Sequence, residues 1–117
     1  MGFLTTHVLD TARGTAAAGV RLRLYRVLND APDLIAEAVT NDDGRCDEPI
    51  LKQEDFAPGV YELRFDVGDY YRRTGVALDD PAFIDIVPVR FGISDADGHY
   101  HVPLLVSPYG YSTYRGS

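Results

Sequence analysis

Three histidines and a hydroxyl-rich C-terminus are the residues of this chain best suited to chemistry. His7 lies near the start of the sequence, and His99 and His101 stand one residue apart near its end. Imidazole titrates close to neutral pH, so a histidine can take up or release a proton under physiological conditions. The segment 109–117 adds phenol and hydroxyl groups around Arg115. These residue types favour general acid–base chemistry, provided that the fold brings them together.

Each of these groups also has a plainer interpretation. A single histidine is more often an ordinary surface or turn residue, and His99 directly follows the turn-forming pair Asp97-Gly98. The spacing His99-x-His101 could hold a metal on a strand, but a zinc site needs three or four ligands. Because the sequence has no cysteine pair and no His-Glu helix motif, we expect no metal.

Cys46 and Arg45 form a second reactive pair of neighbours. Cys46 is the only cysteine, so an intrachain disulfide is impossible. Arg45 would lower the pKa of its thiol and Asp47 would raise it, and a lone cysteine without a motif is more often inert. Arg45 itself is either a solvated turn residue or a clamp for an anion at the mouth of a pocket.

Composition excludes several classes of protein. The chain has 117 residues, which fits a single domain over residues 1–117. Its net charge of −7 argues against a nucleic-acid binder, because phosphate contacts need a positive surface. No apolar run approaches the roughly 20 residues that span a bilayer. The first residues have neither a basic start nor an apolar stretch, so we expect no secretory signal and a cytoplasmic location.

Alternation of apolar and polar residues with period 2 predicts a series of short strands. The predicted strands cover residues 5–10, 20–28, 34–40, 49–52, 59–67, 84–93, 100–107 and 109–115. Only residues 69–79 could hold a short helix. Seven or eight short strands separated by turns are typical of an all-β sandwich. Pro88 and Pro103 fall inside predicted strands, so each should lie at an edge or a bulge.

The same period sorts the candidate residues onto faces of the strands. His7 shares a face with Thr5 and Leu9. The face of segment 100–107 that carries Tyr100, Val102, Leu104 and Val106 is apolar and should meet the core. Its other face, with His101, mixes polar and apolar residues, which suggests a subunit interface or a lined pocket. His7 and His101 meet only if their two strands are neighbours.

Several motifs together resemble the 5-hydroxyisourate hydrolases, the transthyretin-related enzymes of urate breakdown. The matching motifs are LTTHVLD at 4–10, TNDDGRC at 40–46, PVRF at 88–91, LLVSPYGYST at 104–113 and YRGS at 114–117. The hormone carrier transthyretin shares the SPYxYST motif but lacks the YRGS ending and the two histidines that match His7 and His101. The resemblance covers nearly the whole chain.

This resemblance implies a transthyretin-like sandwich of two four-stranded sheets with at most one short helix. It implies a homotetramer, a dimer of dimers, whose active sites lie in a central channel. It further implies that 5-hydroxyisourate is hydrolysed to 2-oxo-4-hydroxy-4-carboxy-5-ureidoimidazoline, a reaction that needs neither a metal nor an organic cofactor. The implied catalytic residues are His7, His101 and Arg45, and the implied substrate-binding residues are Arg45, Ser112, Tyr114, Arg115, Gly116 and Ser117. Two other interpretations compete with this one. They are a transthyretin-like carrier of an aromatic ligand and a general β-sandwich interaction module.

Overall fold

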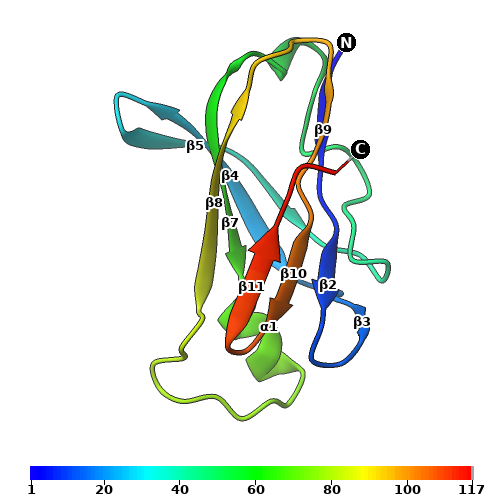
Figure 1. Cartoon of the computed structure of the whole chain (residues 1–117), viewed down its shortest axis with the longest axis vertical. Helices are drawn as coiled ribbons and strands as arrows, with labels where there is room; N and C mark the ends of the chain where they lie inside the picture. Colours follow the sequence, from blue (N-terminus) through cyan, green and yellow to red (C-terminus); the bar gives the residue numbers. More distant parts are fainter. Residues whose placement is uncertain (117) are drawn as a thin grey trace.

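Two layers of β-sheet pack face to face in the computed structural model, which describes residues 1–116 (Figure 1). The strands are β1 Phe3–Thr5, β2 Val8–Asp10, β3 Thr15–Ala16, β4 Arg21–Leu28, β5 Ala31–Val39, β6 Leu51–Lys52, β7 Gly59–Asp66, β8 Ile86–Ile93, β9 His99–His101, β10 Leu104–Ser107 and β11 Gly110–Thr113. One helix, α1 Val67–Arg73, and a single 3-10 turn, η1 Gln53–Asp55, accompany them. The predicted β-sandwich with one short helix is confirmed.

Three sheets make up the sandwich. One has the strand order β5-β4-β7-β8, and a second has the order β11-β10-β2-β3. A third, short sheet has the order β6-β1-β9. It lies beyond the second sheet, because β1 and β9 are continued along the chain by β2 and β10 (Figure 1).

Two of the predicted strands, over residues 5–10 and 100–107, are each interrupted once in the structure. The first is divided into β1 and β2, and the second into β9 and β10. Pro103 has no N–H group to give to a ladder, and β9 ends before it. Backbone bonds still cross the gap: the amides of Val102 and Leu104 donate to the carbonyls of Thr5 and His7, each at 2.9 Å. His7 and His101 therefore lie beside the interruption.

The core follows the predicted alternation. Tyr100, Val102, Leu104 and Val106 are all at most 6% exposed, which confirms the predicted core face of segment 100–107. In β4 the alternation changes sides, because a register shift lies between Leu24 and Tyr25. As a result the next buried residue after Leu24 is Val27, and Arg26 is only partly buried.

Turn residues explain why several boundaries differ from those predicted. Asn29 and Asp30 have φ values of 52° and 60° and form the hairpin turn by themselves, so β5 begins at Ala31 instead of residue 34. Gly75, with φ of 86°, follows the end of α1, which therefore stops well before residue 79. Pro88 lies in β8, an edge strand, as predicted. Among residues 1–116, no helix is long and apolar enough to cross a membrane.

A buried carboxylate ties α1 to the sheet. Asp10 is 1% exposed and accepts hydrogen bonds from the hydroxyls of Tyr70 and Tyr71, each at 2.8 Å. The amides of Ala12 and Arg13 also donate to it, at 3.1 and 3.2 Å. Burial and this carboxylate raise the pKa of both phenols. Asp10 thus fixes the end of β2, the strand that follows directly after His7.

Replacing Asp10 with alanine is expected to lower the free energy of unfolding by about 3 kcal/mol, because buried tyrosine hydroxyls lose their acceptor. Urea unfolding at a fixed protein concentration measures the change. Asp69→Asn, which alters an exposed carboxylate on α1, is the matched control and should cost less than about 1 kcal/mol. Equal stability of the two variants would contradict the role of Asp10.

Candidate active site

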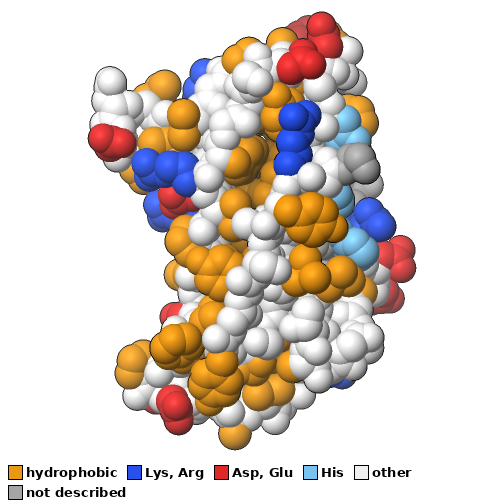
Figure 2. All heavy atoms as spheres, in the orientation of Figure 1, with side chains coloured by type: hydrophobic (Ala, Val, Ile, Leu, Met, Phe, Trp, Pro, Cys, Tyr) orange, Lys and Arg blue, Asp and Glu red, His pale blue; other side chains and the backbone are white. Residues whose placement is uncertain are grey.

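A hollow of about 220 Å³ opens beside β1 and β9. It is lined by Thr5, Thr6, Arg45, Cys46, Glu48, His99 and His101. Pockets for drug-sized ligands are usually about 300 Å³ or larger, so this hollow suits a small polar molecule. Figure 2 shows the histidine side chains gathered along one edge of the molecule, next to basic and acidic groups.

His101 is held from both sides. Its Nδ1 lies 2.8 Å from Thr5 Oγ1, across the parallel pair β1 and β9. The other edge of the ring faces Gly116, whose amide donates to the His101 carbonyl at 2.7 Å. A Cβ atom at position 116 would lie 2.6 Å from His101 Cδ2, so only glycine fits there without moving the ring. Gly116 of the terminal motif therefore packs directly against the histidine.

The electrostatic surroundings of His101 favour its neutral form. Burial lowers its pKa, and so do the nearby positive charge of Arg45 and the neighbouring His99 and His7. A half-buried neutral imidazole can accept a proton from a reacting group. The surroundings of His101 thus favour the neutral form, which is the form that can accept a proton.

The turn that follows Thr40 brings Arg45 and His7 together. Asn41 Oδ1 accepts from the amides of Asp43 and Arg45, at 2.9 and 3.2 Å. Gly44, with φ of 76°, packs so closely on β2 that a Cβ would collide with the Val8 carbonyl. This close docking pairs Arg45 with His7 in an isolated antiparallel bridge.

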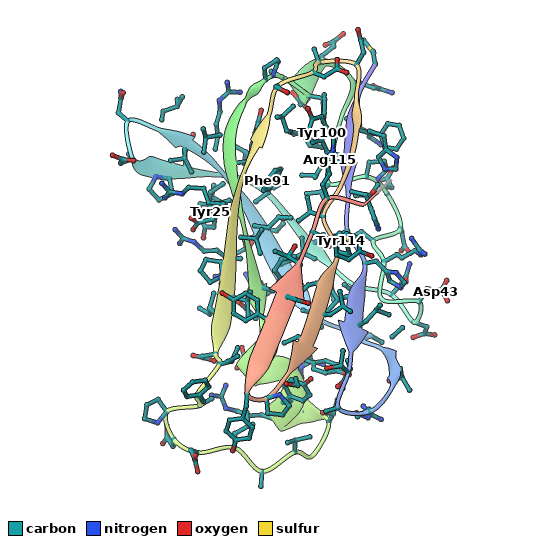
Figure 3. The ribbon with its side chains drawn as sticks, in the orientation of Figure 1. Tyr25, Asp43, Phe91, Tyr100, Tyr114 and Arg115 are labelled. Carbon is teal, nitrogen blue, oxygen red and sulfur yellow. The ribbon has the colours of Figure 1, made fainter. Side chains whose placement is uncertain are left out.

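The same turn orients the ring of His7. Its Nε2 lies 2.8 Å from the carbonyl oxygen of Asp43, which can only accept, so Nε2 carries the proton. In the neutral ring the lone pair is then on Nδ1. Figure 3 shows Asp43 at the outer edge of the molecule. This contact is one that the sequence did not suggest.

His99 is a member of the site and not a turn residue, which corrects the plainer interpretation of its sequence context. The turn ends at Gly98, and His99 is the first residue of β9. Its ring stacks on Phe3 with centroids 4.2 Å apart. Its Nε2 lies 2.8 Å from Thr5 Oγ1, the same oxygen that His101 reaches. The spacing His99-x-His101 was the available signal, because residues two apart on a strand share a face.

The remaining predicted substrate-binding residues lie outside this hollow. Arg115 stacks on the ring of Tyr100, with its Cζ 4.0 Å from the centroid (Figure 3). Arg115 and Tyr114 line a separate hollow of about 200 Å³. Ser112 is exposed on β11, opposite Leu105. Ser117 is outside the described residues. Of the predicted site residues within 1–116, Arg45, His7, His101 and Gly116 lie together.

Cys46 lines the hollow but has an unreactive setting. Burial, assisted by Asp47, raises the pKa of its thiol, so the nucleophilic thiolate is disfavoured. Within residues 1–116, no group of three or more His, Cys, Asp or Glu side chains is placed to hold a metal ion. Glu48, also in the lining, pairs with Lys52 at 3.1 Å.

Comparisons with known proteins find similar sequences and similar folds. The 5-hydroxyisourate hydrolase of Pseudomonas aeruginosa is 62% identical over 117 residues, which cover 100% of this chain and 93% of that protein. Among solved structures, an (S)-allantoin synthase is 49% identical with a TM-score of 0.93. The match covers 99% of this chain and 44% of the synthase chain. Transthyretin from Sparus aurata is 30% identical with a TM-score of 0.85, covering 97% of this chain and 95% of that one.

The similarity is also detected at the level of the family. Residues 4–116, which make up nearly the whole chain, match the HIUase/Transthyretin family. The resemblance found in the sequence motifs is therefore confirmed by an independent comparison. This chain belongs to the HIUase/Transthyretin family.

Proposed function

We propose that this chain is a single-domain 5-hydroxyisourate hydrolase, which opens the cyclic amide of its substrate in urate breakdown. The observation that carries the proposal is the placement of half-buried His101 and Arg45 in one hollow, with His7 bridged to Arg45. The 62% identical relative in Pseudomonas aeruginosa, which carries the same activity in its name, supports it.

In the proposed reaction a water molecule attacks the ring carbonyl carbon of 5-hydroxyisourate. His101 takes a proton from this water, and His7 helps to orient it. The carbonyl carbon–nitrogen bond then breaks, and a histidine returns a proton to the departing ring nitrogen. No electrons are transferred, so no redox cofactor is needed.

Arg45 supplies the positive charge of the proposed site. Its guanidinium can hold the anionic substrate or the oxyanion that forms as water adds. Arg45 and His101 line the same hollow, and the positive charge of Arg45 helps to lower the pKa of that histidine. Substrate contacts from Ser112, Tyr114, Arg115, Gly116 and Ser117 are part of the same proposal, and Gly116 supports it by packing on His101.

The proposed active form is a homotetramer, a dimer of dimers. Two observations support association: β8 and β11 are sheet edges, and large apolar side chains near them are exposed, including Ile86 at 48% and Tyr111 at 48%. Assembly would also bring the residues that lie apart in one chain closer to a neighbour's site. A cytoplasmic location, without nucleic-acid or membrane partners, stays a prediction from the sequence.

A carrier protein is the second candidate, because transthyretin from Sparus aurata has the same fold. The discriminating test follows the ultraviolet decay of 5-hydroxyisourate generated in situ from urate, with and without the protein. Decay accelerated in proportion to protein concentration supports the hydrolase. A folded tetramer that leaves the spontaneous rate unchanged would exclude it and favour the carrier.

The activity should fall on the acid side with a midpoint below pH 6.5. His101 acts as a base only when neutral, and its surroundings lower its pKa from the ordinary value of 6.5. Activity is therefore expected to be level through neutral pH and to decline as protonation sets in. Initial rates corrected for spontaneous decay at each pH measure this. A midpoint above pH 6.5, or activity that rises on acidification, would contradict the assignment.

A further inference from the structure

One hydroxyl group joins two histidines of the site. Thr5 Oγ1 lies 2.8 Å from His101 Nδ1 and 2.8 Å from His99 Nε2. A threonine hydroxyl has a single proton, so it donates to one ring and accepts from the other. The tautomers of His99 and His101 are therefore coupled through Thr5.

We propose that Thr5 is a positioning residue that keeps His101 protonated on Nδ1, and that His99 receives the proton released through this chain of hydrogen bonds. In this arrangement His101 Nδ1–H donates to Thr5 Oγ1, and the Thr5 hydroxyl donates to His99 Nε2. The lone pair of His101 is then on Nε2, free to accept a proton from water. The inference rests on the proposed hydrolase function and assigns roles to two further residues.

The opposite arrangement would disable the base. If His99 donated to Thr5 and Thr5 donated to His101 Nδ1, then neutral His101 would carry its proton on Nε2. No lone pair would remain on that ring to take the proton of the attacking water. Base catalysis by His101 therefore requires the direction from His101 to His99.

The surroundings of the two rings favour the same direction. His101 is half-buried near Arg45 and His7, so a positive charge that stayed on it would be disfavoured. His99 is exposed, and its new charge would be solvated by water. Stacking on Phe3, with centroids 4.2 Å apart, holds the His99 ring in line with the hydroxyl. The geometry thus provides a route from the half-buried ring of His101 to the exposed ring of His99.

The proton balance is as follows. Water gives a proton to His101 Nε2 while its oxygen bonds to the substrate carbonyl carbon. His101 gives its Nδ1 proton to Thr5 Oγ1, and Thr5 gives its own proton to His99 Nε2. Thr5 and His101 end neutral, His99 ends as an imidazolium, and the tetrahedral adduct carries the added hydroxide.

The first test uses the assembled full-length protein with Thr5→Val, which removes the hydroxyl at nearly constant volume, and Thr5→Ser, which keeps it. We expect Thr5→Val to lower kcat about tenfold or more with little change in KM, and Thr5→Ser to restore most of the activity. Thr11→Val is the matched control, because its hydroxyl donates to the Val106 carbonyl away from the histidines. It should keep the wild-type kcat.

The second test reads the tautomers directly and needs no substrate. With only three histidines in the chain, their ring nitrogens can be assigned by ¹⁵N NMR at a pH where all are neutral. We expect protonated Nδ1 and bare Nε2 on His101 in the wild type, and a shift toward the Nε2-protonated form in Thr5→Val. His99→Gln, whose amide can accept from Thr5 but cannot take up a proton, should keep the His101 tautomer and lose kcat.

The results separate the inference from the proposed function. An Nε2-protonated His101 in the wild type overturns the role of Thr5, and wild-type kcat in His99→Gln overturns the role of His99. If Thr5→Ser is as slow as Thr5→Val, the packing of the threonine methyl group matters and the hydroxyl does not. That result would also overturn the inferred role of Thr5. If the protein has no hydrolase activity at all, the proposed function fails while the NMR result still tests the tautomer.

Discussion

Replacing His101 with alanine is expected to lower kcat for 5-hydroxyisourate by about 10²–10⁴-fold, the usual contribution of a positioned general base. The expected change in KM is small, because the imidazole acts on the attacking water and contributes little to holding the substrate. His101 is half-buried and packed between Thr5 and Gly116, which fixes the position of its ring. Steady-state kinetics with correction for spontaneous decay measure the effect.

Chemical rescue distinguishes lost catalysis from a damaged fold. The alanine variant leaves a space of imidazole size beside Thr5, so added imidazole should restore part of the rate in His101→Ala and leave the wild type unchanged. Far-ultraviolet circular dichroism and the oligomeric state should match those of the wild type. If His101→Ala and His7→Ala both kept full activity in an intact assembly, the assignment of the two histidines would be wrong.

The sequence predicted the faces of the strands better than the contacts between them. Period-2 alternation placed Tyr100 and Val102 in the core and His101 on the opposite face, and this is local information. It could not place Thr5 beside His101, since the two are 96 residues apart and meet only through the parallel pair β1 and β9. Resemblance to the family supplied the closeness of the histidines that the pattern left open.

The positions that sequence reasoning missed all depend on long-range packing or on a backbone atom. Asp43 acts on His7 through its carbonyl oxygen, which the side-chain type does not reveal. His99 follows a turn and looked like part of it, but pairing with Phe3 makes it a strand residue. Asp10 looked like a polar end of a strand, and its tyrosine partners lie 60 and 61 residues away.

Replacing Arg45 with glutamine is expected to lower kcat/KM by about 10²–10³-fold, because the developing oxyanion loses its charged donor. Arg45→Lys keeps the charge but loses the planar pair of donors, so it should recover only part of the activity. Arg21→Gln is the matched control, since it removes one positive charge from an exposed pair with Glu37 at the sheet surface. It should behave as the wild type.

The pH profile of Arg45→Gln gives a second, independent readout of the same side chain. The guanidinium now disfavours protonation of His101 and so lowers its pKa. Without this charge the pKa of His101 should rise, and the acid limb of the remaining activity should move toward neutral pH. Added salt screens the charge of Arg45, so it should also move the acid limb of the wild-type profile toward neutral pH. The acid limb of Arg45→Gln should move less, because that charge is already absent. An acid limb unchanged by the substitution would show that Arg45 is not electrostatically coupled to His101, and any loss of activity would then reflect binding alone.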